Sequence, residues 1–175
     1  MFHLKLFGGA SLDGPAGPVG GRAVQRRRLA LLALLATTRG RGVTREKLVG
    51  YLWPDSDPER ARPLLSDSIY RVNQAVGGEA LLAVGEELRL NADVLRCDVV
   101  DFRDAVARRD WERAVELYTG PFLDGFYLTS ADEFERWIET AAGRELAPLV
   151  AALRARAEAI RAHELHRHRA RLGDL

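Results

Sequence analysis

The sequence contains one cysteine, Cys97, one methionine and only two lysines among its 175 residues. A single cysteine excludes an internal disulfide, and such scarcity is typical of proteins in a reducing cytoplasm. The longest uninterrupted apolar run, residues 29–36, has eight residues, whereas a membrane-spanning helix needs about 20. The first residues also lack the basic-then-apolar pattern of a signal peptide. We therefore predict a cytoplasmic protein with no membrane partner.

Groups of side chains that carry catalysis are missing as well. Paired carboxylates, nucleophile triads and metal-ligand clusters are not found, so we expect neither an enzyme nor a cofactor. The glycine-rich stretch 8–21 is not a phosphate loop, because no Gly-Lys-Ser/Thr sequence closes it. His163 and His166 are one residue too close for a zinc-binding His-Glu-x-x-His helix, and a solvated helix end is expected there. Cys97 has no neighbouring histidine and is expected to be a packed thiol.

The charges are distributed unevenly along the chain, and arginine supplies 24 of the 26 cationic side chains. Residues 1–97 carry a net charge of +4 and residues 98–175 a net charge of −3, while residues 1–50 alone carry +7. This asymmetry suggests two modules with different partners. Arginine is suited to the recognition of phosphate and guanine, although codon bias in a GC-rich genome explains the same excess equally well.

Residues 1–96 are predicted to form an α+β domain. Residues 2–7 alternate apolar and polar side chains, which is the period of a half-buried strand, and a second short strand follows. Residues 80–90 have the pattern of a β-hairpin that turns at Gly85-Glu86-Glu87. Between them, helices are predicted over residues 22–38, 45–53 and 58–76. Strands, three helices and a hairpin follow one another in this order in a winged helix-turn-helix domain.

The ends of these helices also have sequence signals. Thr44 is expected to cap the second helix and Asp57 the third, and Gly77 is expected to end the third. Pro63 lies inside the third helix, so this helix is expected either to kink or to begin after Pro58.

Residues 97–175 are predicted to be all-helical. Asp98 is expected to cap a helix, which turns at Arg109-Asp110 into a second helix. A long helix is expected from residue 131 into the 160s, weakened by Gly143 and Pro148. Such helices are typical of the start of a tetratricopeptide-like array, here truncated after about one and a half repeats. Either the chain is a fragment, or the open edge after Phe134 and Trp137 meets a partner.

Several segments, in a specific order, resemble one family of bacterial proteins. They are residues 21–32, 43–48, 52–54, 59–62, 97–102, 120–126 and 134–137. The first four are similar to the winged helix of response-regulator effectors, and the last three resemble the start of the bacterial transcriptional activation domain (BTAD). Together they resemble the antibiotic-regulatory-protein (SARP) family of transcription factors, over about residues 2–160.

This resemblance implies a winged helix-turn-helix DNA-binding domain over residues 1–96. It also implies the start of a tetratricopeptide-like BTAD domain over residues 97–175. The partners it implies are double-stranded DNA with direct repeats, RNA polymerase and a second copy of the chain on repeated sites. It implies no catalysis and no cofactor.

In such a fold the third helix enters the major groove of DNA. The face opposite Leu65, Ile69, Val72 and Val76 is the one expected to contact it. The candidates on this helix are Ser66, Asp67, Ser68, Tyr70, Arg71 and Asn73. Arginine suits guanine or phosphate, asparagine suits adenine, and serine can contact either bases or phosphate. Three further arginines are expected to contact phosphates, namely Arg26, Arg27 and Arg62.

Three carboxylates oppose this prediction. Asp67 repels phosphate unless it accepts a hydrogen bond from cytosine, and Glu86 and Glu87 occupy a hairpin tip that normally offers a cation. Two hypotheses therefore remain. One is a sequence-specific transcriptional regulator, expected to be an activator, and the other is a winged-helix and helical-repeat interaction module of a larger signalling protein that has lost DNA binding. A continuous positive strip from Arg26 past Arg62 to Arg71 favours the first.

Overall fold

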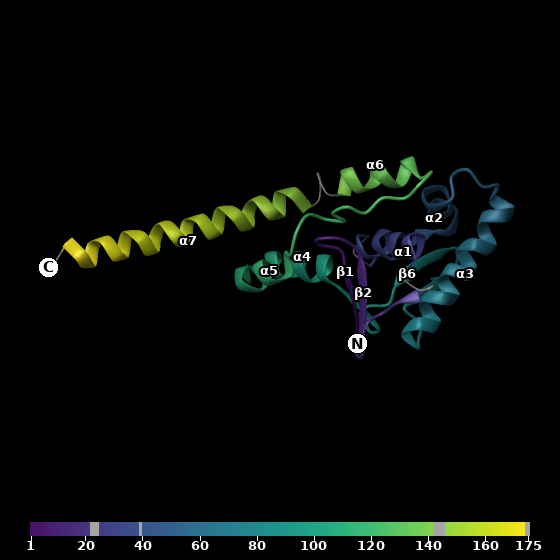
Figure 1. Cartoon of the computed structure of the whole chain (residues 1–175), viewed down its shortest axis with the longest axis horizontal. Coiled ribbons are helices and arrows are strands. Elements are labelled where there is room, and N and C mark those ends of the chain that lie inside the picture. The colour runs from purple at the N-terminus through teal and green to yellow at the C-terminus, as the bar shows by residue number, and fades with distance from the viewer. Residues whose placement is uncertain (22–24, 39, 142–145, 174–175) are drawn as a thin grey trace.

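The computed structural model describes residues 1–21, 25–38, 40–141 and 146–173, with side chains as far as residue 162. Its elements are β1 (Phe2–Lys5), β2 (Ser11–Gly14), β3 (Gly17–Pro18), α1 (Arg26–Ala36), β4 (Val43–Thr44), α2 (Arg45–Leu52), α3 (Pro58–Val76), β5 (Leu81–Val84), β6 (Glu87–Leu90), β7 (Leu95–Cys97), α4 (Asp98–Arg108), α5 (Trp111–Leu117), α6 (Asp132–Thr140) and α7 (Ala147–Gly173). The predicted fold class is confirmed: a mixed α/β part precedes a helical part (Figure 1).

Two small sheets frame the first half. One has the strand order β3-β2-β1-β7, and the other has the order β4-β6-β5. Strand β7, which the sequence analysis did not predict, pairs in parallel with β1 and sets Leu4 opposite Cys97. The predicted boundary at residue 96 therefore falls inside a strand of the first sheet. Burial in this strand raises the pKa of the Cys97 thiol, as expected of a packed side chain.

Helix α1 is the centre of the core, and every residue from Arg28 to Ala36 is buried. Its apolar side chains point in all directions because α2, α3 and β6 pack around it. The helix begins at Arg26 in the described residues, later than the predicted residue 22, and residues 22–24 lie outside them. The predicted cap on α2 is confirmed, since the Thr44 hydroxyl accepts from the Lys47 N–H at 3.3 Å.

Helix α3 is continuous from Pro58 through Pro63, so the expected later start is wrong. The Pro63 side chain is exposed to solvent. Asp57 occupies the capping position, but its side chain makes no capping hydrogen bond. The predicted end is confirmed, because Gly77 adopts a left-handed φ of 64° that residues with a Cβ rarely adopt.

The prediction that Asp98 caps this helix is wrong: Cys97 occupies the capping position without a side-chain capping bond, and Asp98 is the first residue of α4. Its carboxylate accepts from the N–H of Leu6 at 2.9 Å and of Phe7 at 3.0 Å, as well as from Val99 at 2.7 Å. These bonds hold the end of β1 against the start of the helical half. Burial raises the pKa of the Asp98 carboxyl, although the three N–H donors act in the opposite direction.

The long helix expected from residue 131 into the 160s corresponds to α6 and α7, and residues 142–145 between them lie outside the described residues. Helix α6 ends at Thr140 and α7 begins at Ala147, while Gly143 lies outside the described residues. Pro148 is the second residue of α7, where its missing N–H needs no partner. With 27 residues, α7 extends about 40 Å and projects away from the rest of the molecule (Figure 1).

Helix α6 lies beside the first half and packs against α2 (Figure 1). Phe134 is fully buried, and the Trp137 ring packs against Phe134 and Phe122 at centroid distances of 5.3 and 6.0 Å. Phe134 and Trp137 are therefore packed within this chain, and the part of the chain that follows them projects as α7. Among the described residues, no helix is both long and apolar enough to cross a bilayer.

Replacing Asp98 tests how strongly the two halves are joined. Asp98→Ala leaves the N–H groups of Leu6 and Phe7 without their acceptor, so the free energy of unfolding should fall by about 1–3 kcal/mol. Urea denaturation followed by circular dichroism measures the change. Asp104→Ala, an exposed carboxylate on the same helix, is the control and should change stability by less than about 0.5 kcal/mol. Equal effects of both substitutions would contradict the anchoring role.

Candidate nucleic-acid interface

The exposed face of α3 is the surface that the sequence analysis assigned to DNA. The inner-face prediction agrees with the structure: Leu65, Val72 and Val76 are buried and Ile69 is half-buried. On the outer side Arg62 and Ser66 are exposed, and Tyr70 exposes 59% of its surface. A face of this kind presents a cation, a hydroxyl and an aromatic ring to solvent on one helix. These groups can bond phosphate oxygens and base edges.

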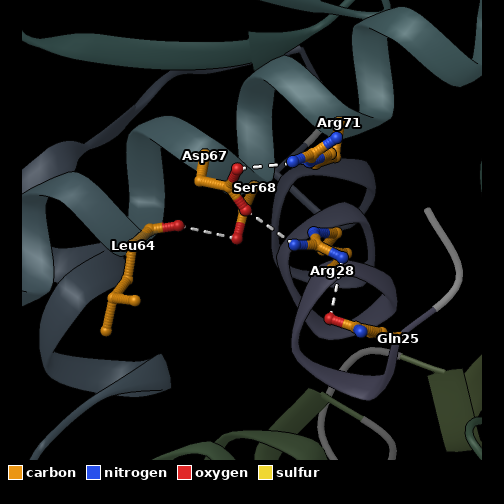
Figure 2. Close-up of polar contacts among 6 residues, drawn as sticks. All are labelled: Gln25, Arg28, Leu64, Asp67, Ser68 and Arg71. Atoms are coloured by element: carbon orange, nitrogen blue, oxygen red, sulfur yellow. Dashed lines mark hydrogen bonds and ion pairs between the residues drawn. The ribbon is translucent and has the colours of Figure 1, made fainter. Parts of the chain in front are cut away.

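An ion-pair cluster occupies the side of α3 that meets α1 (Figure 2). Arg28 donates from Nη2 to Asp67 Oδ2 at 2.8 Å and from Nη1 to Gln25 Oε1 at 2.8 Å. The other carboxylate oxygen, Asp67 Oδ1, accepts from Arg71 Nε at 3.2 Å. The side chain of Arg28 is only 9% exposed, while those of Asp67 and Arg71 are 47% and 33% exposed.

This cluster changes the effect that the charge of Asp67 is expected to have on a nearby phosphate. The sequence analysis expected its charge to repel phosphate or to accept from cytosine. In the structure two guanidinium groups share the carboxylate, so its charge is compensated inside the protein. Arg71 bonds Asp67 through Nε, which leaves the two terminal nitrogens of its guanidinium for other acceptors. Sequence reasoning missed Arg28, whose only signal is a third consecutive arginine at the start of an apolar run.

Two predicted contact residues are engaged elsewhere. Ser68 is 4% exposed and donates its hydroxyl to the Leu64 carbonyl at 2.8 Å (Figure 2). The Asn73 side chain accepts from the Leu81 N–H at 3.0 Å and donates to the Leu81 carbonyl at 3.3 Å. Asn73 therefore joins the end of α3 to β5, because its side-chain amide bonds both backbone groups of Leu81 as a neighbouring strand would. Both side chains are set apart from the exposed face.

The two arginines at the start of α1 contact the helical half. Arg26 donates to the Tyr127 carbonyl at 3.2 Å, and its guanidinium lies 4.7 Å from the centroid of the Tyr127 ring. Arg27 donates to the carbonyls of Leu52 at 2.9 Å and Thr129 at 3.3 Å. At the Arg26 end of the predicted positive strip, the loop before α6 thus bonds both guanidinium groups, while Arg26 itself stays exposed.

The β5–β6 hairpin carries both acidic and basic groups. Glu86 is exposed at its tip, but Glu87 is half-buried and pairs with Arg89 at 3.2 Å. Arg89 is the cation of this hairpin that the sequence analysis missed. Its signal was the spacing of two, which sets Glu87 and Arg89 on the same face of a strand. One of the two opposing carboxylates is therefore compensated and the other is not.

Comparison with known proteins supports the fold. The structure of Mycobacterium tuberculosis EmbR in complex with a low affinity phosphopeptide is similar to this chain, with a TM-score of 0.65 and 24% sequence identity. The match covers 90% of this chain and 45% of the EmbR chain, so this chain spans less than half the length of that protein. At this identity the likeness establishes the arrangement of helices and strands.

A second comparison concerns the C-terminal helices alone. The family described as glutamyl-tRNAGlu reductase, dimerisation domain, matches residues 129–175, which comprise α6 and α7 with their flanking residues. No curated protein matches the chain.

A substitution at Asn73 separates a structural role from DNA contact. Asn73→Ala should lower the free energy of unfolding by about 1–3 kcal/mol, because both polar groups of Leu81 lose their partner. Gln74→Ala, an exposed neighbour on α3, should be nearly neutral. Urea denaturation of both variants gives the comparison. Unchanged stability in Asn73→Ala together with lost DNA affinity would show that Asn73 contacts a base after all.

Proposed function

We propose that the protein is a sequence-specific DNA-binding transcriptional regulator. Helix α3 enters the major groove, and the β5–β6 hairpin lies against the adjacent minor groove. The observation that carries this proposal is the outer face of α3, where Arg62, Ser66 and Tyr70 are exposed. Beside them, Arg71 retains two guanidinium nitrogens that Asp67 does not bond. The order of elements and the resemblance to the SARP family support the same conclusion.

Each group has an expected partner. Arg71 is suited to the two acceptors on the major-groove edge of guanine, and Arg62 to a phosphate. Ser66 and the Tyr70 hydroxyl add neutral donors to the sugar-phosphate backbone. Arg89 is the hairpin's cation for the minor-groove side, although it also pairs with Glu87.

A second candidate function has its own support. Arg26 and Arg27 are engaged by the loop at residues 127–129, and Glu86 stays exposed at the hairpin tip. Both observations favour an interaction module of a larger signalling protein that does not bind DNA. The compensated charge of Asp67 favours the regulator, because the strongest objection to α3 as a DNA-binding helix is thereby removed.

Selection from a random pool of duplexes at two salt concentrations tests DNA binding. The protein should enrich a repeated motif and bind it more weakly as salt rises. Arg71→Ala should abolish the preference at one base pair per repeat, with a loss of about 1–3 kcal/mol of binding free energy. Arg62→Ala should weaken binding to all sequences and reduce the salt slope by about 1.

The control for this selection is Arg113→Ala, which removes the same charge from an exposed pair with Glu116 on α5. It should leave the motif and the affinity unchanged. Weak, salt-sensitive association without an enriched motif would exclude the regulator and favour the interaction module.

The regulator is further proposed to act as an activator on direct repeats. Two copies bind neighbouring repeats, and the helical half, which carries the net negative charge, contacts RNA polymerase. The family that matches residues 129–175 is described as a dimerisation domain, which supports placing the contact between copies on α6 and α7. Ile160 on α7 is 43% exposed and provides an apolar group for such a contact.

Sedimentation at several protein concentrations tests the pairing of copies. Ile160→Asp should weaken self-association by about ten-fold or more, since it introduces a charge into an apolar contact, while binding to a single repeat stays unchanged. Val115→Asp, at a similarly exposed apolar position on α5, should have no effect. A wild-type protein that is monomeric both alone and on a repeated site would contradict this assignment.

A further inference from the structure

Arg28 differs from Arg62 and Arg71 because it lies on α1 and its side chain is buried. It belongs to α1, its side chain is 9% exposed, and its guanidinium faces Asp67 and Gln25 (Figure 2). A side chain buried in this way does not reach a DNA duplex that lies on the outer face of α3. Its link to that face runs through the carboxylate of Asp67.

The geometry of the carboxylate determines what this link does. Arg28 holds Oδ2 at 2.8 Å, and Oδ1 accepts from Arg71 Nε at 3.2 Å. When one oxygen of a planar carboxylate is held by a buried donor, the position of the other oxygen is set as well. A guanidinium bonded through Nε then has a restricted orientation, and its end-on edge, formed by one N–H of each terminal nitrogen, faces away from that bond.

We propose that Arg28 is a positioning residue for DNA recognition, which through Asp67 sets the direction in which Arg71 presents its guanidinium to a guanine. This inference rests on the proposed function and adds to it the residue that controls specificity at one base pair. Each oxygen of Asp67 already accepts from one arginine, so in this proposal Asp67 acts within the protein and the base contact is made by Arg71.

If Arg71 loses its orientation, base discrimination should change. If an arginine loses a phosphate contact, the salt dependence of binding should change instead. A bidentate contact between arginine and guanine depends on the alignment of two donors with two acceptors, whereas a phosphate contact tolerates many orientations. Disturbing the cluster should therefore reduce discrimination between bases at one position. The number of phosphate contacts, and with it the salt slope, should stay the same.

The experiment measures base preference, salt slope and melting temperature for four variants of the full chain. They are Asp67→Asn, Arg28→Lys, Arg71→Ala and the double variant Asp67→Asn with Arg71→Ala. Duplexes carry each of the four bases at every position of the selected motif. Asp67→Asn is the main variant because its side chain is half exposed and its replacement keeps the shape. Arg28→Lys keeps the buried charge but loses the planar fork.

Asp67→Asn and Arg28→Lys should lower the preference for guanine at the Arg71 position by about ten-fold and leave the other positions and the salt slope unchanged. In the Arg71→Ala background, Asp67→Asn should cause no further change in preference. Glu59→Gln removes the same charge from an exposed residue of α3 and should leave the preference intact, which separates orientation from net charge.

Two results would overturn the inference. In the first, Asp67→Asn alters the preference at a different position and still does so without Arg71, which identifies Asp67 as a base contact. In the second, Asp67→Asn keeps the full preference at the Arg71 position while it folds normally. If the wild-type protein selects no motif, the proposed function itself fails, and this outcome is distinct from the other two.

Discussion

The ion pair between Arg28 and Asp67 is the constraint on which the arrangement of the first half depends. A charged guanidinium inside a helix that is otherwise packed with leucine and alanine is costly to bury unless a carboxylate accepts from it. Asp67 supplies that carboxylate from the neighbouring helix α3. The pair joins α3 to α1 on the side next to the apolar face of α3. Leu65, Val72 and Val76 face the core, and the opposite side remains exposed.

The second half of the chain is joined to the first by hydrogen bonds to backbone groups as well as by side-chain packing. Asp98 accepts from two N–H groups at the end of β1, and the loop after α5 continues this contact, since the Gly8 N–H donates to the Pro121 carbonyl at 2.8 Å. Gly120 is required here, because a Cβ at this position would lie 2.9 Å from the Gly8 Cα. The loop then reaches the start of α1 before α6 packs on α2. The loop and α6 therefore lie along the first half, and α7 projects from it (Figure 1).

Arg26 and Arg27, which the sequence analysis assigned to phosphate contact, bond the helical half of the chain. Both side chains donate to carbonyls of residues 127–129, about a hundred positions away in the sequence. Part of the basic charge of the first 50 residues is therefore engaged by carbonyl groups of the helical half.

The sequence by itself determined the features that depend on near neighbours. The helical periodicity of Leu65, Val72 and Val76, the cap at Thr44 and the left-handed glycine at Gly77 act within a few residues, so one sequence was enough to predict them. The tertiary structure alone decided β7, the anchor at Asp98, the engagement of Asn73 by β5 and the pairing of Arg28 with Asp67. These contacts join residues 8 to 93 positions apart, and a hydrogen bond depends on distances of about 3 Å in space. A single sequence contains the donors and acceptors but not their separation, which the packing of α1, α3 and the two sheets determines.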